Sequence, residues 1–338
     1  MKRRMFMTAL SVLAALAPGG APRAQELKEI VVGGVQLPTN APLFIAIDRG
    51  YFAAEGLKVN VTWFTAAATV FSAVVSRDVD IGITGTTAAT FNLASKGGFK
   101  IIGGTTREAP GFHINAFMVS NKAYAAGFTG LRDMEGKRIA MTTAGSTQQY
   151  YVGLFARKYG IDPKAINMVP LESFANMIAA LQSGQVDAAI LPPIPAQRLL
   201  DANNAHLIAW AGDEVPWQQG VIFASPQTLA TKRDTVERFM RAFVKGAAEY
   251  NRNFNQLGPD GKIARGPDYD ALATLIAEHA GIKRNELDGQ IAFIDPAARY
   301  DEADILRQVA FWQEQGLVVK GFDFTKIFDP SFLPPAAK

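Results

Sequence analysis

The stretch 36–63 constrains the fold more than any other part of the sequence, because it contains a loop, a helix and a strand with their end signals intact. Asn40 can cap a helix over about residues 42–49, with Pro42 in its first turn and Gly50 at the left-handed stop position. The stretch ends in a run of alternating apolar and polar residues, which predicts a strand with one buried face. This is the start expected of an α/β domain.

Predicted strands and helices keep alternating as far as residue 224, which indicates mostly parallel sheets with helices on both faces. From residue 234 the apolar residues recur at helical spacing instead, which predicts a C-terminal helical part. A chain of 338 residues is long enough for two domains, and we expect two lobes.

An internal echo also favours two lobes. The pattern S-x-x-V-D-x-x-I occurs at 76–83 and again at 183–190, each time where a helix ends and a strand is expected to begin. Chance could produce an echo this short, but we interpret it as two lobes built on the same βαβ plan. Asp80 and Asp187 are then structural residues at the entry of a strand, not catalytic ones.

Several short motifs carry a resemblance to a known family. They are APL at 41–43, GYF at 50–52, EGL at 55–57 and LRDMEGKRIA at 131–140. With them the chain resembles the nitrate/sulfonate/taurine-type solute-binding proteins of ABC importers, which are related to thiamine-pyrimidine-binding proteins. The resemblance covers nearly the whole chain after residue 24 and weakens after about residue 225.

The resemblance implies a periplasmic-binding-protein-like α/β fold, with two βαβ lobes joined by two crossover strands and C-terminal helices. The first lobe would be discontinuous, comprising residues 25–114 and 225–338, and the second would comprise residues 115–224. It also implies a monomer that captures a small-molecule solute in the cleft, closes about a hinge, and delivers the solute to an ABC permease and ATPase complex in the inner membrane.

The N-terminus is typical of an exported protein. Lys2, Arg3 and Arg4 precede an apolar run at 5–17, and a Pro-Gly-Gly break follows. This predicts a cleaved signal peptide over residues 1–24, too short to remain as a membrane span, with cleavage after residue 21 or 24. The paired arginines fit either a Sec or a twin-arginine signal. The predicted location is the periplasm.

Charge and cysteine content exclude several classes of protein. The net charge of +3 becomes −1 without residues 1–24, which hold four basic residues and no acidic one, and no basic stripe indicates nucleic-acid binding. The chain has no cysteine, which excludes disulfides, cysteine-bound metals and a lipid anchor on cysteine.

Four predicted loops have the composition of a small-molecule site. They are 36–40, 65–69, 84–87 and 142–148, all rich in small polar residues and poor in charge. In open α/β sheets, ligands bind beyond the carboxyl ends of the strands, where helix N-termini favour an anion. Plain helix capping would explain any single loop, but four such loops favour a site. The candidate residues are Gln36, Asn40, Thr65, Ala66, Thr84, Thr86, Thr87, Thr143, Gly145, Ser146 and Thr147.

Five further residues outside these loops complete the candidate ligand-binding set. Arg107 and His113, near the crossover, can donate hydrogen bonds into the cleft or form surface ion pairs. Glu172 can accept a hydrogen bond from a ligand or cap a helix in solvent. Trp217 can stack on a ring or pack in the core. Pro193 belongs to a proline-rich turn before a predicted helix.

No catalytic signature is present. The sequence lacks a nucleophile elbow, a phosphate-binding loop and a dinucleotide fingerprint, and its three histidines are too far apart in sequence for a paired metal motif. We therefore expect no catalytic residue, no metal and no cofactor. The neutral loops favour an organic anion, a sulfonate or a carboxylate, either aliphatic or aromatic. The alternatives are a neutral pyrimidine-like solute, a periplasmic sensor module, or an enzyme like the pyrimidine-synthesising relative, whose Cys-rich motif is absent here.

Overall fold

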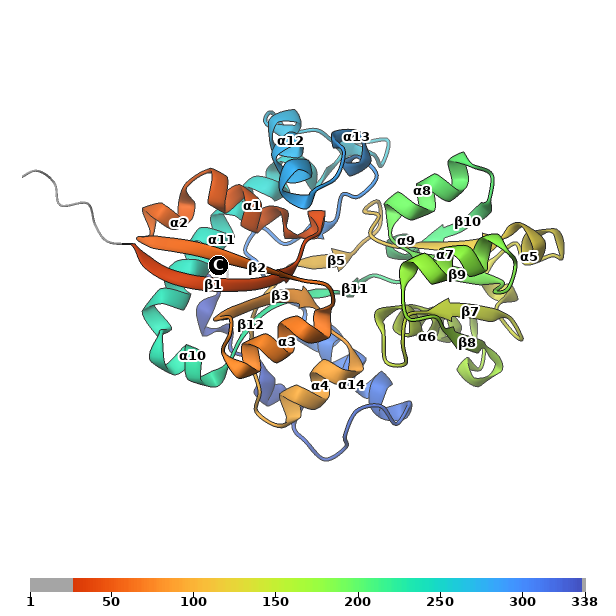
Figure 1. The fold of residues 1–338 in the computed structure, drawn as a ribbon, viewed down its shortest axis with the longest axis horizontal. Coiled ribbons are helices and arrows are strands. Elements are labelled where there is room, and N and C mark those ends of the chain that lie inside the picture. Colours follow the sequence, from red (N-terminus) through yellow and green to blue (C-terminus); the bar gives the residue numbers. More distant parts are fainter. Residues whose placement is uncertain (1–26, 336–338) are drawn as a thin grey trace, which may run out of the picture.

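The computed structural model describes residues 27–335, so the predicted signal peptide at 1–24 lies outside the described residues. The chain forms a mixed α/β molecule around two five-stranded sheets, and we call the parts around them the first and the second lobe. Figure 1 shows the first lobe on the left and the second on the right, with strands β5 and β11 passing between them.

The first sheet has the strand order β2-β1-β3-β12-β4. Strand β1 pairs in parallel with β2 and β3, whereas β12 returns from the second lobe and runs antiparallel to β3 and β4. The strands are β1 Lys28–Val35, β2 Leu57–Phe64, β3 Ile81–Gly85, β4 Lys100–Gly104 and β12 Gly220–Ala224.

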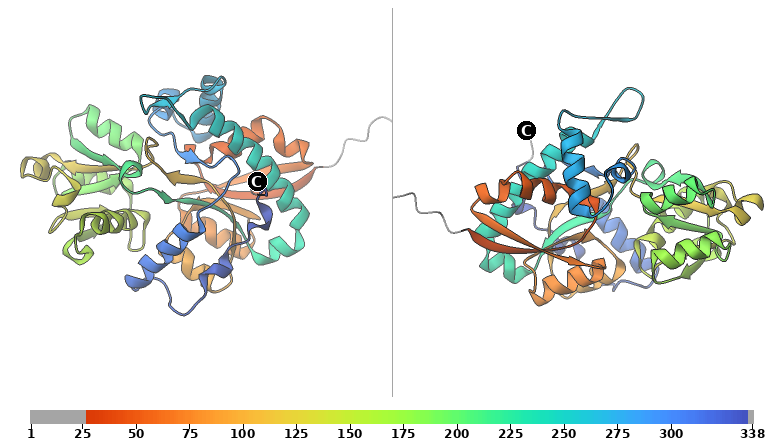
Figure 2. Two further views of the ribbon diagram at one scale, coloured as in Figure 1. Left: turned by 180° about the vertical axis from the view of Figure 1, so that it is seen from behind. Right: turned by 45° about the horizontal axis from the view of Figure 1, so that its top comes forward.

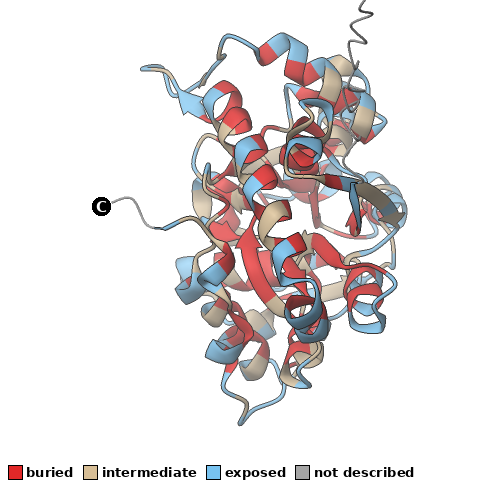
Figure 3. Ribbon diagram, turned by 90° about the vertical axis from the view of Figure 1, so that its left-hand side faces the viewer, coloured by how far each residue is buried: buried red, intermediate tan, exposed pale blue. Residues whose placement is uncertain are grey.

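Helices cover both faces of this sheet, so its strands are largely buried, except the edge strand β2, where Leu57 alone is fully buried (Figure 3). The predicted first helix is present as α1, and it packs with the long amphipathic α11 and with α12 over one face. Helices α3 and α4 cover the other face. The bounds are α1 Ala41–Asp48, α2 Tyr51–Ala54, α3 Ala67–Ser76, α4 Ala88–Ser95, α10 Pro226–Thr231, α11 Arg233–Phe254, α12 Tyr269–Ala280 and α13 Arg284–Leu287.

The second sheet has the order β10-β6-β9-β7-β8, in which β7 is parallel to β8 and β9 while β6 is antiparallel to β9 and β10. Its strands are β6 Ala116–Ser120, β7 Arg138–Met141, β8 Asn167–Pro170, β9 Ala188–Leu191 and β10 Ala205–Trp210. Its helices are α5 Asn121–Ala125, α6 Thr147–Tyr159, α7 Phe174–Gln182, α8 Pro193–Asp201 and α9 Ala211–Glu214.

The internal echo corresponds to a repeated piece of structure. Asp80 precedes β3, its N–H donates to Val31 O on β1, and its carboxylate accepts from the Val31 N–H at 3.1 Å. Asp187 precedes β9 and makes the same two bonds with Arg138 on β7, the carboxylate accepting from the N–H at 2.8 Å. Burial alone would raise the pKa of Asp187, but the Arg138 guanidinium and N–H bring that pKa below its usual value. Both aspartates therefore join neighbouring strands.

A small three-stranded sheet and a C-terminal helix connect the lobes. Strand β5 Thr106–Glu108 pairs with β11 Trp217–Gln218 on one side and with β15 Phe293–Ile294 on the other. Helix α14 Glu302–Glu314 lies against α4 and the second lobe (Figure 2). A short hairpin, β13 Gln256–Leu257 with β14 Ile263–Ala264, follows α11.

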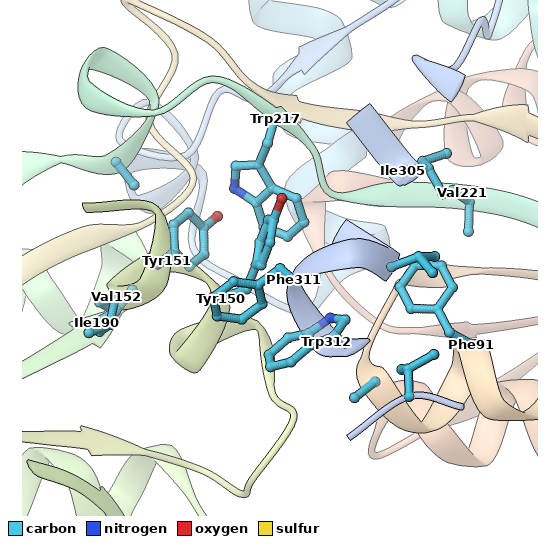
Figure 4. Close-up of a cluster of buried hydrophobic side chains, with 14 of the residues drawn as sticks. Phe91, Tyr150, Tyr151, Val152, Ile190, Trp217, Val221, Ile305, Phe311 and Trp312 are labelled. Atoms are coloured by element: carbon cyan, nitrogen blue, oxygen red, sulfur yellow. The ribbon is translucent and has the colours of Figure 1, made fainter. Parts of the chain in front are cut away.

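Aromatic side chains from both lobes meet beside these connections (Figure 4). Trp217 of β11 packs edge-on against Tyr150 and Tyr151 of α6, and Tyr150 in turn contacts Phe311 and Trp312 of α14. The hydrophobic core is thus continuous from the first lobe into the second on this side of the molecule.

The strand that begins the second lobe is short. The apolar residues within 113–120 predict a strand over that whole range, whereas β6 begins only at Ala116. The side chain of Asn115 is instead buried in a hydrogen-bonded cluster, and its carbonyl oxygen accepts from the Ala211 N–H. Within residues 27–335 there is no helix long and apolar enough to cross a membrane.

Candidate functional site

A cavity of about 270 Å³ lies between the two lobes and is lined by both. The first lobe contributes the loop before α1, the end of β3 and the residues flanking β5, β11 and β15. The second lobe contributes residues just before β6 and the starts of three helices. The lining residues are Val35, Leu37, Pro38, Thr39, Asn40, Ile83, Thr84, Gly85, Thr105, Thr106, His113, Ile114, Asn115, Thr147, Gln148, Phe174, Pro192, Pro193, Gln219, Gly220, Gln290 and Ala292.

Four helices begin at the wall of this cavity. Asn40 is the residue before α1, and Thr147, Phe174 and Pro193 are the first residues of α6, α7 and α8. The first turn of a helix has N–H groups without partners inside the helix, and its dipole favours negative charge. Pro42 in α1 and Pro193 and Pro195 in α8 have no N–H to donate, so the starts of α6 and α7 are where the wall can receive an anionic group without a cationic side chain.

The rest of the wall is substantially apolar. Val35, Ile83 and Ile114 line it, together with prolines from both lobes. Leu37 of the first lobe and Phe174 of the second are 47% and 37% exposed, which is unusual for large apolar side chains, and both border the cavity. A ligand with an apolar part would cover these two side chains.

The cavity lining contains no lysine, arginine, aspartate or glutamate, and His113 is its single titratable side chain. Burial lowers the pKa of His113, and the carboxylate of Asp213, 3.8 Å from Nε2, offsets this only in part. The ring stacks on Trp210 with a centroid distance of 4.3 Å. At neutral pH His113 is therefore an uncharged hydrogen-bonding group.

Two asparagines in the lining are held by their own amino groups. Asn40 donates from Nδ2 to the carbonyl oxygen of Val35 at 2.6 Å. Asn115 donates from Nδ2 to Glu108 Oε1 at 3.0 Å and to the Tyr151 hydroxyl at 2.7 Å. Both side chains are almost fully buried, and their orientation is therefore fixed by the protein.

A buried carboxyl group lies behind the Asn115 wall. Glu108 of β5 is completely buried, and its Oε1 accepts from Asn115 and from the Tyr151 hydroxyl. Burial raises the pKa of Glu108 to about 7, hydrogen bonds from Tyr151 and Asn115 lower it only in part, and the charge of Asp213 raises it further. Because these partners come from both sides of the crossover, the cluster ties β5 to the second lobe.

The structure places five of the predicted site residues in the lining of the cavity: Asn40, Thr84, His113, Thr147 and Pro193. They come from the loop before α1, the end of β3, the crossover and the starts of α6 and α8. The expectation that loops at strand ends converge is met by three of the four predicted loops.

Two of these three loops, 84–87 and 142–148, also meet each other beside the cavity. The Ala88 N–H, directly after Thr87, donates to Gly145 O at 3.1 Å, which brings the start of α4 onto the loop before α6. Thr87 itself caps α4, accepting from the Thr90 N–H. Gly145 has a φ of 78° and lies so close to Ala88 that a Cβ would approach its methyl group to 2.8 Å.

Several predicted residues make structural contacts instead of lining the cavity. Gln36 Nε2 donates to the carbonyl oxygen of His279, and Thr86 donates to Gln308 Oε1 at 2.7 Å. Arg107 pairs with Asp301 at 3.3 Å. Ser146 is buried next to Thr147, and its hydroxyl has no partner.

The remaining predicted residues lie outside the cavity lining. Thr65, Ala66 and Thr143 are exposed, and so is Glu172, whose φ is 67°. Trp217, considered above for ring stacking, is only 2% exposed and packs among Tyr150 and Tyr151. Trp217 is therefore a core residue, which is the second of the two roles proposed for it from the sequence.

The sequence did not identify the lining residues next to the crossovers and in the C-terminal segment. Thr105, Thr106, Asn115 and Gln219 flank the connections between the lobes, and Gln290 follows α13. Polar residues at the ends of strands that lead into a crossover were an available signal for the first four. Gln290 lies in an irregular segment with no such signal.

Comparison with known families identifies the class of protein. The family model described as NMT1/THI5 like matches residues 38–253, which is more than half of the chain. The chain belongs to this NMT1/THI5-like family, as its motifs indicated. No curated protein sequence matches it significantly.

Several solved structures with the same fold are periplasmic binding proteins. The alkanesulfonate-binding protein SsuA from Xanthomonas axonopodis pv. citri, bound to MOPS, is 18% identical and has a TM-score of 0.67, with 90% of this chain and 99% of that chain covered. SsuA from Escherichia coli is 15% identical, with a TM-score of 0.69 and coverage of 88% and 96%.

The nitrate-binding protein NrtA from Synechocystis PCC 6803 has the same fold, with 13% identity, a TM-score of 0.67 and coverage of 92% and 88%. At these identities the likeness shows the fold. The predicted periplasmic-binding-protein-like α/β fold is confirmed.

Proposed function

We propose that this protein is the solute-binding component of an ABC importer and that it captures a small organic anion, a sulfonate or a carboxylate, in the cavity between its lobes. The observation that carries the proposal is the cavity itself, lined by both lobes and by the starts of four helices. Family membership and the binding functions named for proteins of the same fold support it.

An anionic group in this cavity would be held by helix N–H groups and hydroxyls. Thr147 and Gln148 begin α6, and Gln148 Oε1 accepts from Thr142, which leaves the Gln148 amino group to donate elsewhere. Thr84, Thr105 and Thr106 add hydroxyls from the first lobe. Such a site recognises a carboxylate or sulfonate oxygen by hydrogen bonds and helix dipoles instead of an ion pair.

The apolar part of the wall indicates the chemical nature of the ligand beyond its anionic group. Leu37 and Phe174 approach the cavity from opposite lobes, so an alkyl or aryl group between them would be covered on two sides. Burial of apolar area contributes about 25 cal/mol per Å², which favours organic anions over small inorganic ones. We therefore infer an alkyl or aryl sulfonate or carboxylate.

Capture is proposed to work by closure of the lobes, with boundaries at residues 25–114 plus 225–338 and 115–224. The lobes touch beside the cavity at Ala88 and Gly145 and through the ion pair of Arg198 and Glu286 at 2.6 Å. A ligand that contacts both lobes binds best where these contacts form, and it shifts the hinge equilibrium toward that state. The closed monomer would then dock on an inner-membrane permease driven by an ATPase, after export to the periplasm.

A neutral pyrimidine-like solute remains a second candidate, because the uncharged amides and hydroxyls of the lining also suit a heterocycle. Glu172 and a tryptophan would be natural partners for such a heterocycle, but neither Glu172 nor any tryptophan lines the cavity. An enzymatic role has less support, since the lining presents a single titratable side chain, His113, and no nucleophile and base in hydrogen-bond contact.

A thermal-shift screen of the mature protein tests the proposal. The panel contains sulfonates including MOPS, aromatic and aliphatic carboxylates, nitrate, pyrimidines and amino acids, added after removal of co-purified ligand. A true ligand at a hundred times its Kd stabilises the folded state by about 2.7 kcal/mol, which raises the melting temperature by several degrees. The expected result is a shift with organic anions, no turnover, and a smaller radius of gyration in solution scattering.

The outcome that contradicts the proposal is equally clear. If no class raises the melting temperature and the radius of gyration never falls, the protein is not a closing receptor for these solutes. Chemical conversion of a panel compound would favour an enzyme instead.

A further inference from the structure

We propose that Asn40 and Asn115 determine specificity by presenting two fixed hydrogen-bond acceptors to the cavity, so that the solute carries an N–H or O–H donor in addition to its anionic group. This inference rests on the proposed function and narrows its ligand class. It follows from how the two amide groups are held.

One hydrogen of the Asn40 amino group has a fixed partner, and this sets the orientation of the amide. Nδ2 donates to the carbonyl oxygen of Val35 at 2.6 Å, a partner that can only accept. Turning the amide over would place two oxygens against each other, so the assignment of nitrogen and oxygen is fixed by chemistry. The Oδ1 branch then points away from Val35, and no donor in residues 27–335 lies within hydrogen-bond distance of it.

Asn115 is held in the same way by a different group. Its Nδ2 donates toward Glu108 Oε1 at 3.0 Å and toward the Tyr151 hydroxyl at 2.7 Å, and these two acceptors lie side by side. The Tyr151 hydroxyl itself donates to Glu108, so it accepts from Asn115. Reversing the amide would break both bonds and turn an oxygen toward Glu108.

Both oxygens have access to the cavity. Fully enclosed polar atoms without a partner do occur in the described chain, on Glu108, Ser146, Trp217 and Tyr300, but neither asparagine oxygen is among them. Asn40 and Asn115 are nevertheless almost fully buried, and both line the cavity. The space that each Oδ1 meets is therefore the cavity.

Two unpaired acceptors in a confined site select for donors. A ligand that places a methyl group against such an oxygen leaves it without a hydrogen bond, and a buried polar group without a partner is costly. A ligand with an amino, amide or hydroxyl group at that position satisfies it. Sites that hydrogen-bond a ligand N–H or O–H discriminate strongly against analogues lacking it.

The test uses pairs of compounds that differ only by an amino group in place of a methyl group. They are aminobenzenesulfonate and toluenesulfonate, aminobenzoate and toluate, and aminopyrimidine and methylpyrimidine, each in the available ring isomers. Titration calorimetry with the mature protein measures their affinities. The expected result is that in the class that binds, at least one amino compound binds at least about tenfold more tightly than its methyl partner.

Variants assign this discrimination to the two asparagines. Asn40→Leu and Asn115→Leu keep the side-chain shape and remove the acceptor, and each should reduce the amino preference severalfold. Asn251→Leu is the matched control, since its Nδ2 also donates to a backbone oxygen, that of Ile294 at 3.0 Å, but it does not line the cavity. Circular dichroism shows whether each variant folds. If a variant does not fold, the compound pairs measured on the wild-type protein still test the inference.

The possible failures are distinguishable. Binding of amino and methyl compounds with equal affinity overturns the inference while leaving the proposed function intact. An amino preference that survives both asparagine substitutions also overturns it. Absence of binding by every compound counts against the proposed function and the inference together.

Discussion

Replacing Trp217 by alanine should lower the free energy of unfolding by about 3–5 kcal/mol, the range for removal of a large buried aromatic side chain. The indole is 2% exposed and packs edge-on against Tyr150 and Tyr151, with ring centroids 4.9 and 5.2 Å away. The loss has two parts, the transfer of apolar surface and the cavity left behind. Since the cluster joins the lobes, neighbouring side chains from both would lose contacts.

Urea unfolding followed by circular dichroism measures this change, and Trp217→Phe is the matched variant. The indole N–H has no hydrogen-bond partner, so phenylalanine removes volume without breaking a hydrogen bond. Trp217→Phe should therefore cost much less than Trp217→Ala and should keep ligand affinity within about threefold, since the ring does not line the cavity. A small loss of stability for alanine would contradict the packing role of Trp217, and a large loss of affinity for phenylalanine would mean that Trp217 contacts the ligand.

Replacing Glu108 by glutamine should make the protein about 3 kcal/mol more stable than the wild type at pH 8, and less than about 1 kcal/mol more stable at pH 5. Burial raises the pKa of Glu108 to about 7 from an ordinary value of 4.5. Between about pH 4.5 and pH 7, Glu108 is protonated in the folded state and ionised in the unfolded state. Wild-type stability therefore falls as the pH rises through this window, and ionisation of Glu108 is the cause.

Glutamine is a close match for the protonated acid, because its oxygen can accept from Asn115 and Tyr151 as Glu108 Oε1 does. Denaturant unfolding of both proteins at several pH values gives the difference, in which the titration of other groups cancels. The raised pKa of Glu108 predicts a stability difference between the two proteins that begins near pH 4, grows up to about pH 7 and then levels off. Parallel stability curves for the two proteins, with no divergence up to pH 8, would show that Glu108 is ionised at little cost.

The fold was largely predictable because local signals and long-range packing agree. The helix with Pro42 near its start and the strand after Gly56 are present as expected, as α1 and β2. The repeated aspartate pattern marked Asp80 and Asp187, which make the same pair of backbone bonds in the two lobes. A short motif could predict this repeated structure because each aspartate of the motif makes both bonds itself, to one residue on the adjacent strand.

The site was predictable only where it follows from strand and helix ends. Asn40 and Thr147 could be found because each lies at the start of a helix after a strand. The sequence could not show that Arg107 pairs with Asp301, because the partners are far apart in the chain. The position of Asn115 next to a strand was an available signal, but its role was not, since that role depends on contacts with Glu108 and Tyr151 that no local motif marks.

The most direct measurement of the central claim is native mass spectrometry of the mature protein mixed in equal amounts with its Thr84→Trp variant. Thr84 lines the cavity from β3, and an indole there would fill much of its 270 Å³. The mixture receives the same panel of sulfonates, carboxylates and pyrimidines. The account predicts that one small molecule binds per wild-type chain and none binds to the variant, while both melt at similar temperatures. Equal binding to the two proteins would show that the solute is held elsewhere and would contradict the account.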